Sequence, residues 1–191
     1  MKTGKVIVLS APSGCGKSTI IHTLTDNGMV DLKFSVSATN RKPREGETAG
    51  VDYHFMSTQQ FKEAIADDSF IEWEQVYPGR YYGTLKSEVA NALNRGENVL
   101  LDIDVKGAIN VKKLFGDKAL TIFILPPDIE TLRQRLIHRG TDAMDEIERR
   151  VSKAEYEISH ADLCDMRIVN DDLDKAVGHT ASAIKTFLAK D

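Results

Sequence analysis

The chain has few cysteines, no long apolar run and no excess of positive charge, and each shortage excludes a class of protein. Its two cysteines, Cys15 and Cys164, lie far apart without metal-ligand spacing, which argues against a disulfide scaffold and favours a reducing, cytoplasmic compartment. No run approaches the length of a membrane span, and the N-terminal residues lead straight into a predicted strand. We therefore expect neither a secretion signal nor a membrane partner. The net charge of −4 argues against nucleic acid as a partner, so any anion site must be a local cluster of basic residues.

What remains is the composition of an ordinary globular domain, with 41% hydrophobic and 28% charged residues. Apolar runs predict strands over residues 5–10, 34–38, 53–56, 70–75, 80–83, 98–104, 120–125 and 167–170. Periodic segments predict helices over residues 17–26, 58–66, 86–95, 128–138, 142–160 and 173–188, with another beginning near residue 106. This alternation favours an α/β fold with a parallel sheet between helices. Residues 35–85 interrupt it with short, antiparallel-looking strands, which we interpret as an insert that carries a second substrate.

Residues 11–19, Ala-Pro-Ser-Gly-Cys-Gly-Lys-Ser-Thr, directly follow a buried-strand pattern and have the layout of a phosphate-binding P-loop. Backbone N–H groups of such a loop cradle phosphates, and the following helix adds its positive N-terminal end. We expect Lys17 to reach the β- and γ-phosphates and the Ser18 hydroxyl to hold Mg²⁺. The predicted nucleotide-binding loop comprises Ala11, Pro12, Ser13, Gly14, Cys15, Gly16, Lys17, Ser18 and Thr19.

Two residues of this loop raise questions of their own. Ala11 stands where the P-loop pattern has glycine, and a positive φ there would cost about 1–2 kcal/mol. We expect a negative φ, which makes the change nearly free. Cys15 lies at a helix N-terminus, where a thiol can be acidified, so a reactive Cys15 whose oxidation blocks the loop is a further hypothesis.

A buried-strand pattern also ends in acids at residues 102 and 104. Asp102 resembles the acid that ends a Walker B strand and organises Mg²⁺ near the P-loop serine. The alternative, a turn or helix-cap role, is common for an isolated Asp. Asp104 could equally cap the helix that begins near Lys106.

Arginine and tyrosine side chains gather in the polar segment between residues 34 and 55. Arg is suited to bidentate contacts with phosphate oxygens, and Arg41 and Arg44 with the Tyr53 hydroxyl could neutralise one phosphate monoester. A solvated charged loop is the alternative interpretation of the same residues.

Glu72 lies between bulky apolar neighbours on a predicted strand. Strand alternation alone permits an exposed Glu without a function. The functional alternative is guanine recognition, because one carboxylate accepts both adjacent donors, N1–H and N2–H₂, of guanine's Watson–Crick edge. Such a site rejects a base that lacks the pair by roughly 10⁴-fold.

The segment 132–151 is rich in arginine around Gly140. Part of it is ordinary helix surface, because acidic residues alternate with the basic ones. A flap whose arginines close over a P-loop nevertheless suits phosphoryl transfer, in which negative charge spreads over the transferred oxygens.

Taken together, these segments resemble the guanylate kinase family over almost the whole chain. The resemblance is carried by residues 11–19, Phe-Ser-Val-Ser-Ala-Thr-Asn-Arg at 34–41, Arg-x-Gly-Glu-x-x-Gly-x-Asp-Tyr-x-Phe at 44–55, Phe-Ile-Glu-Trp at 70–73, Tyr-Tyr-Gly at 81–83, Leu-Asp-Ile-Asp at 101–104, Arg135 with Arg-Gly-Thr at 139–141, and Ile-Val-Asn-Asp-Asp-Leu at 168–173. It implies one domain over residues 1–191: a three-layer α/β P-loop core (about 1–34, 87–128 and 151–191), a small α+β GMP-binding insert (about 35–86) and a helical lid (about 129–150).

The resemblance also implies roles for individual residues. Ser37 and Glu72 would read guanine, with Thr84 where the family often has Ser. The implied substrate-binding set comprises Ser37, Arg41, Arg44, Tyr53, Glu72, Tyr82, Gly83, Thr84 and Asp104. Lys17, Arg139 and Arg150 would be catalytic, Ser18 and Asp102 would hold the metal, Arg135 would assist the ATP phosphates, and Asn170 would lie near the adenine. Lys106 stands where the family commonly has Gln.

The implied reaction is the Mg²⁺-dependent transfer of a phosphoryl group from ATP to GMP or dGMP, giving GDP. ATP and GMP are then the partners, and the sequence does not indicate an oligomeric state. The alternative is a non-catalytic guanylate-kinase-like module that binds phosphorylated protein segments, disfavoured because Lys17 and Ser18 are both present. A kinase for AMP or a pyrimidine monophosphate is disfavoured by Ser37 and Glu72.

Overall fold

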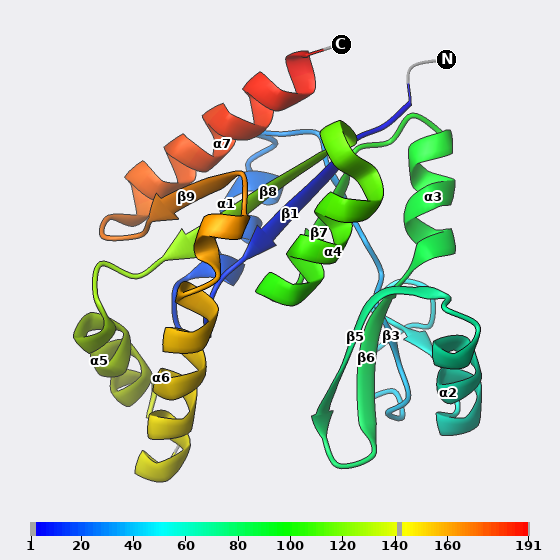
Figure 1. The fold of residues 1–191 in the computed structure, drawn as a ribbon, viewed down its shortest axis with the longest axis horizontal. Helices are drawn as coiled ribbons and strands as arrows, with labels where there is room; N and C mark the ends of the chain where they lie inside the picture. Colours follow the sequence, from blue (N-terminus) through cyan, green and yellow to red (C-terminus); the bar gives the residue numbers. More distant parts are fainter. Residues whose placement is uncertain (1–2, 141–142, 191) are drawn as a thin grey trace. The chain divides into compact units, whose positions relative to one another are not determined.

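The computed structural model describes residues 3–140 and 143–190, which fall into two units (Figure 1). The first unit comprises Met1–Val6 and Lys33–Leu101, and the second comprises Ile7–Leu32 and Asp102–Asp191. Strands β1 and β7 each begin in the first unit and end in the second.

Five strands form the main sheet, in the order β2-β7-β1-β8-β9. They are β1 (Val6–Ser10), β2 (Lys33–Phe34), β7 (Val99–Asp102), β8 (Ala119–Leu125) and β9 (Met166–Val169). The pairs β2/β7 and β8/β9 are parallel. All five residues of β1 are buried, as are six of the seven in β8, which is why these strands are continuous apolar runs. The predicted α/β fold with a parallel sheet is confirmed.

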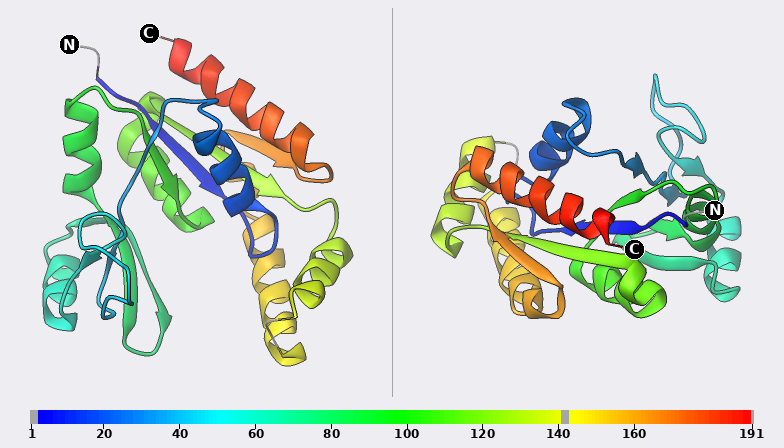
Figure 2. Two further views of the ribbon diagram at one scale, coloured as in Figure 1. Left: turned by 180° about the vertical axis from the view of Figure 1, so that it is seen from behind. Right: turned by 90° about the horizontal axis from the view of Figure 1, so that it is seen from above.

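Helices cover both faces of the sheet in the second unit, where α1 and α4 lie on opposite sides (Figure 2). The helices are α1 (Lys17–Asp26), α4 (Val105–Phe115), α5 (Ile129–Arg139), α6 (Met144–Ile158) and α7 (Leu173–Ala189), with short 3₁₀ turns η1 (Gly116–Lys118) and η2 (Ala161–Leu163). Helix α7 packs against α1, β8 and β9, whereas α4 packs against β8. Aspartates cap three of these helices, each accepting from the backbone N–H three residues on: Asp104, Asp128 and Asp172.

The first unit holds a four-stranded sheet in the order β4-β3-β6-β5. Its elements are β3 (Ala38–Thr39), β4 (His54–Phe55), α2 (Thr58–Ala66), β5 (Phe70–Tyr77), β6 (Arg80–Leu85) and α3 (Lys86–Asn94). A capping box between Ser57 and Gln60 starts α2 at the predicted residue. Phe61 of α2 is fully buried, with ring centroids 4.5 Å from Phe70 and 5.5 Å from Tyr81, so the helix is fixed on the β5/β6 hairpin.

Three sequence-based expectations need correction. The strand expected at 34–38 is two strands in different sheets, because residues up to Phe34 pair with β7 and Ala38 onward pair with β6. The insert's strands are not all antiparallel, since β3 and β4 run parallel. The strand expected at 98–104 ends at Asp102, because Asp104 caps α4 instead. The start of the helix expected at 142–160, which is Asp142, lies outside the described residues. Of the helices in residues 3–140 and 143–190, none is both long and apolar enough to cross a membrane.

Both cysteines are free and buried in the second unit. Cys15 is 0% exposed, and burial raises the pKa of its thiol to about 12. Burial likewise raises the pKa of the Cys164 thiol to about 11. The hypothesis of an acidified, reactive Cys15 is therefore wrong: desolvation of the thiolate outweighs the nearby positive charges of Arg135 and Lys17.

We expect both thiols to resist alkylation in the folded protein. At pH 8 the thiolate is a minute fraction of either group, because that pH lies far below both raised pKa values, and both residues are buried. Iodoacetamide labelling followed by peptide mass spectrometry should show slow modification of the native protein and rapid modification in denaturant. Fast labelling of native Cys15 at pH 8 would contradict this assignment.

Candidate active site

The loop between β1 and α1 has the backbone conformation that phosphate binding requires. Gly14 and Gly16 have φ angles of 94° and 83°, in the left-handed region that favours glycine. Among the described residues, Asp68 is the only non-glycine with a positive φ, so the φ of Ala11 is not positive. The expectation of a negative φ at Ala11 is confirmed, and alanine fits this position without strain.

Neighbouring side chains close off the outer side of the loop. A Cβ on Gly14 would lie 3.0 Å from methyl carbons of Leu132 and Leu136, two fully buried residues of α5. A Cβ on Gly16 would lie 2.5 Å from the side-chain nitrogen of Asn170. These side chains thus cover the outer side of the loop, which leaves its other side free for a ligand.

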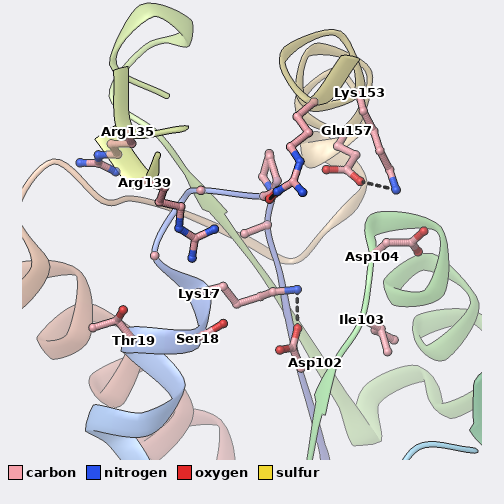
Figure 3. A pocket seen from close by; sticks show the side chains of 16 residues that line it. Lys17, Ser18, Thr19, Asp102, Ile103, Asp104, Arg135, Arg139, Lys153 and Glu157 are labelled. Carbon is pink, nitrogen blue, oxygen red and sulfur yellow. Dashed lines mark hydrogen bonds and ion pairs between the residues drawn. The ribbon is translucent and has the colours of Figure 1, made fainter. Parts of the chain in front are cut away.

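In front of the loop the second unit contains a cavity of about 540 Å³ (Figure 3). Its lining is rich in charged side chains from the loop, β7, α5 and α6. The lining residues are Ala11, Pro12, Ser13, Gly14, Gly16, Lys17, Ser18, Thr19, Asp102, Ile103, Asp104, Arg135, Arg139, Arg150, Lys153 and Glu157. Five cationic and three acidic side chains therefore meet here, with the cations in excess. This balance suits a polyanionic ligand.

Lys17 and Asp102 form an ion pair inside the cavity (Figure 3). The Ser18 side chain lies beside them at the start of α1. One carboxylate and one hydroxyl fit Mg²⁺, which is usually held by few protein oxygens together with substrate phosphates and water. No group of three or more His, Cys, Asp or Glu residues within the described residues could hold a metal by itself. Asp104 also lines the cavity, and its carboxylate accepts from the Gly107 N–H at 2.8 Å, as the helix-cap alternative predicted.

The predicted lid residues reach the cavity from α5 and α6. The Arg150 guanidinium donates to the Ser13 hydroxyl at 3.1 Å, and the Arg135 guanidinium donates to the Asn170 carbonyl at 3.0 Å. Arg139 extends from the end of α5 towards the loop (Figure 3). Thr141, part of the family pattern, lies outside the described residues.

Two charged residues of the cavity, Lys153 and Glu157, were missed by sequence reasoning. Their charged groups are 3.8 Å apart, and Glu157 is 7% exposed. The available signal was the helical spacing, because residues 150, 153 and 157 follow at i, i+3 and i+7 and so share a face of α6. Because acidic and basic residues alternate in this segment, part of it was interpreted as ordinary helix surface.

A second group of polar residues lies in the first unit, across the four-stranded sheet. Glu72 and Thr84 are opposite each other on β5 and β6, and the Thr84 hydroxyl donates to the Glu72 carboxylate at 2.7 Å. Ala38 is opposite Gly83, and continuing that antiparallel register by one residue places Ser37 opposite Thr84. The three residues expected to recognise guanine therefore lie in one row across neighbouring strands.

Three of the residues expected to bind a phosphate, Arg41, Tyr53 and Tyr82, lie next to this row. The Arg41 guanidinium carbon is 4.8 Å from the Tyr53 ring centroid, and the Tyr53 and Tyr82 rings are 5.9 Å apart. Tyr82 precedes Thr84 by two residues on β6, so both side chains point to the same face of the sheet. The arginine, both tyrosines and the Glu72/Thr84 pair therefore form one site.

Glu47 holds the arginines of this site, and sequence reasoning assigned it no role. Its carboxylate accepts from both terminal nitrogens of Arg41 at 2.6 Å and from the backbone N–H of Arg44 at 2.7 Å. These hydrogen bonds, the side-chain bond from Arg41 first, lower the pKa of Glu47 to about 2 and raise the pKa of Arg41. The Arg44 side chain is exposed. The sequence signal for this role is that Glu47 follows Arg44 by three residues in a basic loop.

Two predicted site residues have packing roles in this structure. A Cβ on Gly83 would lie 2.9 Å from the Glu72 carbonyl oxygen and 2.9 Å from the Phe70 ring. Glycine is therefore needed at this position of β6, where it pairs with β5. Asn170, expected near the adenine, is 5% exposed, does not line the cavity, and donates through its side-chain amide to the Cys15 carbonyl at 2.8 Å.

Comparisons with known proteins agree with this arrangement. A family model described as guanylate kinase matches residues 3–187. The guanylate kinase of Porphyromonas gingivalis is 52% identical over 186 residues, covering 97% of this chain and 99% of that protein. The guanylate kinase of Salinibacter ruber is 49% identical over 189 residues, covering 99% of this chain and all of that protein.

A solved structure gives the same result. The crystal structure of guanylate kinase from Anaplasma phagocytophilum aligns with a TM-score of 0.72 and 28% identity, covering 100% of this chain and 89% of that one. Full-length relatives that carry the enzyme's name decide against the alternative of a non-catalytic module. The chain therefore belongs to the guanylate kinase family.

Proposed function

We propose that the protein transfers the γ-phosphoryl group of MgATP to GMP, and to dGMP, giving ADP and GDP or dGDP. The observation that carries this proposal is the site on the first unit, where a carboxylate–hydroxyl pair for guanine shares a sheet face with a paired arginine and two tyrosines. The family and the phosphate cavity of the second unit support the donor half of the reaction.

The acceptor chemistry follows from these contacts. The Glu72 carboxylate accepts from guanine N1–H and N2–H₂, while the Thr84 hydroxyl keeps that carboxylate in place. The Tyr53 and Tyr82 hydroxyls and the remaining N–H groups of Arg41 bind the GMP phosphate. The attacking phosphate oxygen is already anionic, so the reaction requires no general base.

The donor chemistry is positioning and charge neutralisation. Loop N–H groups hold the phosphates of ATP, and Lys17 exchanges Asp102 for the β- and γ-phosphates when nucleotide binds. Arg139 and Arg150 neutralise the charge of the phosphoryl group in flight, and Arg135 assists from α5. Ser18 and Asp102 would hold Mg²⁺, which would supply further positive charge to the phosphates. We place the reaction in the cytoplasm, where two free thiols remain reduced.

The base specificity should follow from Glu72. An ADP-coupled assay with GMP, dGMP, AMP, CMP and UMP as acceptors should give turnover with GMP and dGMP. Activity with AMP should be lower by roughly 10⁴-fold, because adenine lacks the adjacent donors and leaves the carboxylate unsatisfied. Equal use of AMP and GMP would refute the proposed acceptor.

Replacing Lys17 with Ala should reduce kcat by roughly a hundredfold or more, because it removes a cation that acts on the transferred phosphoryl group. Steady-state kinetics with saturating GMP measures the effect, and circular dichroism checks the fold. The matched control is Lys33→Ala, which removes a lysine paired with Glu97 at 3.3 Å in the first unit. If both variants retained full turnover, the P-loop assignment would fall.

Glu72→Gln should lower kcat/KM for GMP by about a hundredfold, because one acceptor becomes a donor and the charge-assisted hydrogen bonds are lost. ATP binding should stay unchanged when measured by calorimetry. Glu63→Gln on the exposed face of α2 provides the control for a lost carboxylate. Equal losses for the two substrates would count against guanine recognition by Glu72.

A further inference from the structure

We propose that Asn170 is a positioning residue of the donor site, which orients one peptide group of the P-loop. The inference rests on the proposed binding of ATP in the cavity of the second unit. It gives the residue a role beyond the one that the family resemblance implies.

The Asn170 side chain is committed to the loop. Its amide nitrogen donates to the Cys15 carbonyl at 2.8 Å in a buried hydrogen bond. Cys15 precedes Gly16, the N-cap residue of α1, so this carbonyl stands outside the helix's own hydrogen-bond ladder. Asn170 supplies the partner that the helix does not.

Holding this carbonyl also sets the direction of an N–H group that faces the cavity. The Cys15 carbonyl and the Gly16 N–H belong to one planar trans peptide and point in opposite directions. Gly16 lines the phosphate cavity, whereas Asn170 does not. Anchoring the carbonyl behind the loop therefore turns the Gly16 N–H towards the phosphates, as a loop that binds anions requires.

Close packing and backbone contacts hold the Asn170 side-chain nitrogen against the loop. A Cβ on Gly16 would lie 2.5 Å from that nitrogen, so the amide rests directly against the loop backbone. The Asn170 backbone is held on both sides, by its N–H to the Leu125 carbonyl at 2.8 Å and by its carbonyl from Arg135 at 3.0 Å. With 5% exposure, the residue is almost wholly enclosed by these contacts.

The test compares ATP with inorganic tripolyphosphate, a probe that has phosphates but no base. Asn170→Ala should weaken tripolyphosphate binding by about tenfold and ATP binding by at least that factor, in calorimetry with Mg²⁺ present, because a buried carbonyl loses its partner. Asn170→Asp should do likewise: it keeps the size, but a carboxylate cannot donate to a carbonyl. GMP binding should be unchanged.

A second measurement reports on the loop itself. Alkylation of Cys15 should become faster in either variant, while Cys164 provides an internal reference in the same unit. The matched control is Asn98→Ala, which removes a side-chain amide that accepts from the Lys5 backbone N–H at 3.1 Å, far from the loop in the chain. This control should leave tripolyphosphate binding and the ratio of the two alkylation rates unchanged.

The outcomes separate the alternatives. Weaker ATP binding with unchanged tripolyphosphate binding would overturn the proposal in favour of an adenine contact. Variants that bind both ligands as well as the wild type would overturn it altogether. If the wild-type protein bound neither ligand, the proposed nucleotide site and the role of Asn170 would both fall.

Discussion

The donor site depends on one constraint, which is that peptide N–H groups must point into the phosphate cavity and be held there before a phosphate arrives. A flexible loop would lose much of its binding energy to ordering. Here α5 leucines pack behind Gly14, Arg150 bonds the Ser13 side chain, and Asn170 bonds the Cys15 carbonyl. The contacts come from distant parts of the chain, so the loop's shape is a property of the folded unit and not of the loop sequence alone.

The cationic side chains of the two sites are also held in place by ion pairs. Cations of both candidate sites have carboxylate partners: Lys17 has Asp102, Arg41 has Glu47, and Lys153 has Glu157. An unpaired charge in a partly buried site is costly, and a carboxylate reduces that cost while fixing the side chain. The two sites use this differently. Lys17 and Asp102 form a single ion pair, whereas Arg41 donates twice to Glu47 and once to the Lys42 carbonyl, so its guanidinium is held more firmly.

Sequence reasoning located most of the elements because the relevant signals are local. The boundaries of α1 and α2 follow from a glycine N-cap and a capping box, and continuous apolar runs mark the central strands. It failed where the decision is made by a distant partner. Residues 34–38 form a short extended segment, but which strand each residue pairs with depends on β7 and β6, which come much later in the chain. Cys15 was misjudged for the same reason: the helix end argues for an acidic thiol, and only the folded core shows that burial dominates.

In the acceptor site, Glu47 keeps the charge and the orientation of Arg41 constant over a wide range of pH. The folded-state pKa of Glu47, about 2, lies below its ordinary value of 4.5. The stabilisation from this depressed pKa is therefore fully present above about pH 4.5 and is lost only as the pH falls towards 2. Arg41 keeps its charge and its orientation over that whole range, because its own pKa is raised by the same hydrogen bonds. A phosphate monoester such as that of GMP has a second pKa near 6, so its own charge changes near neutral pH. A fixed arginine favours the dianion, and the dianion is the form whose oxygen attacks ATP.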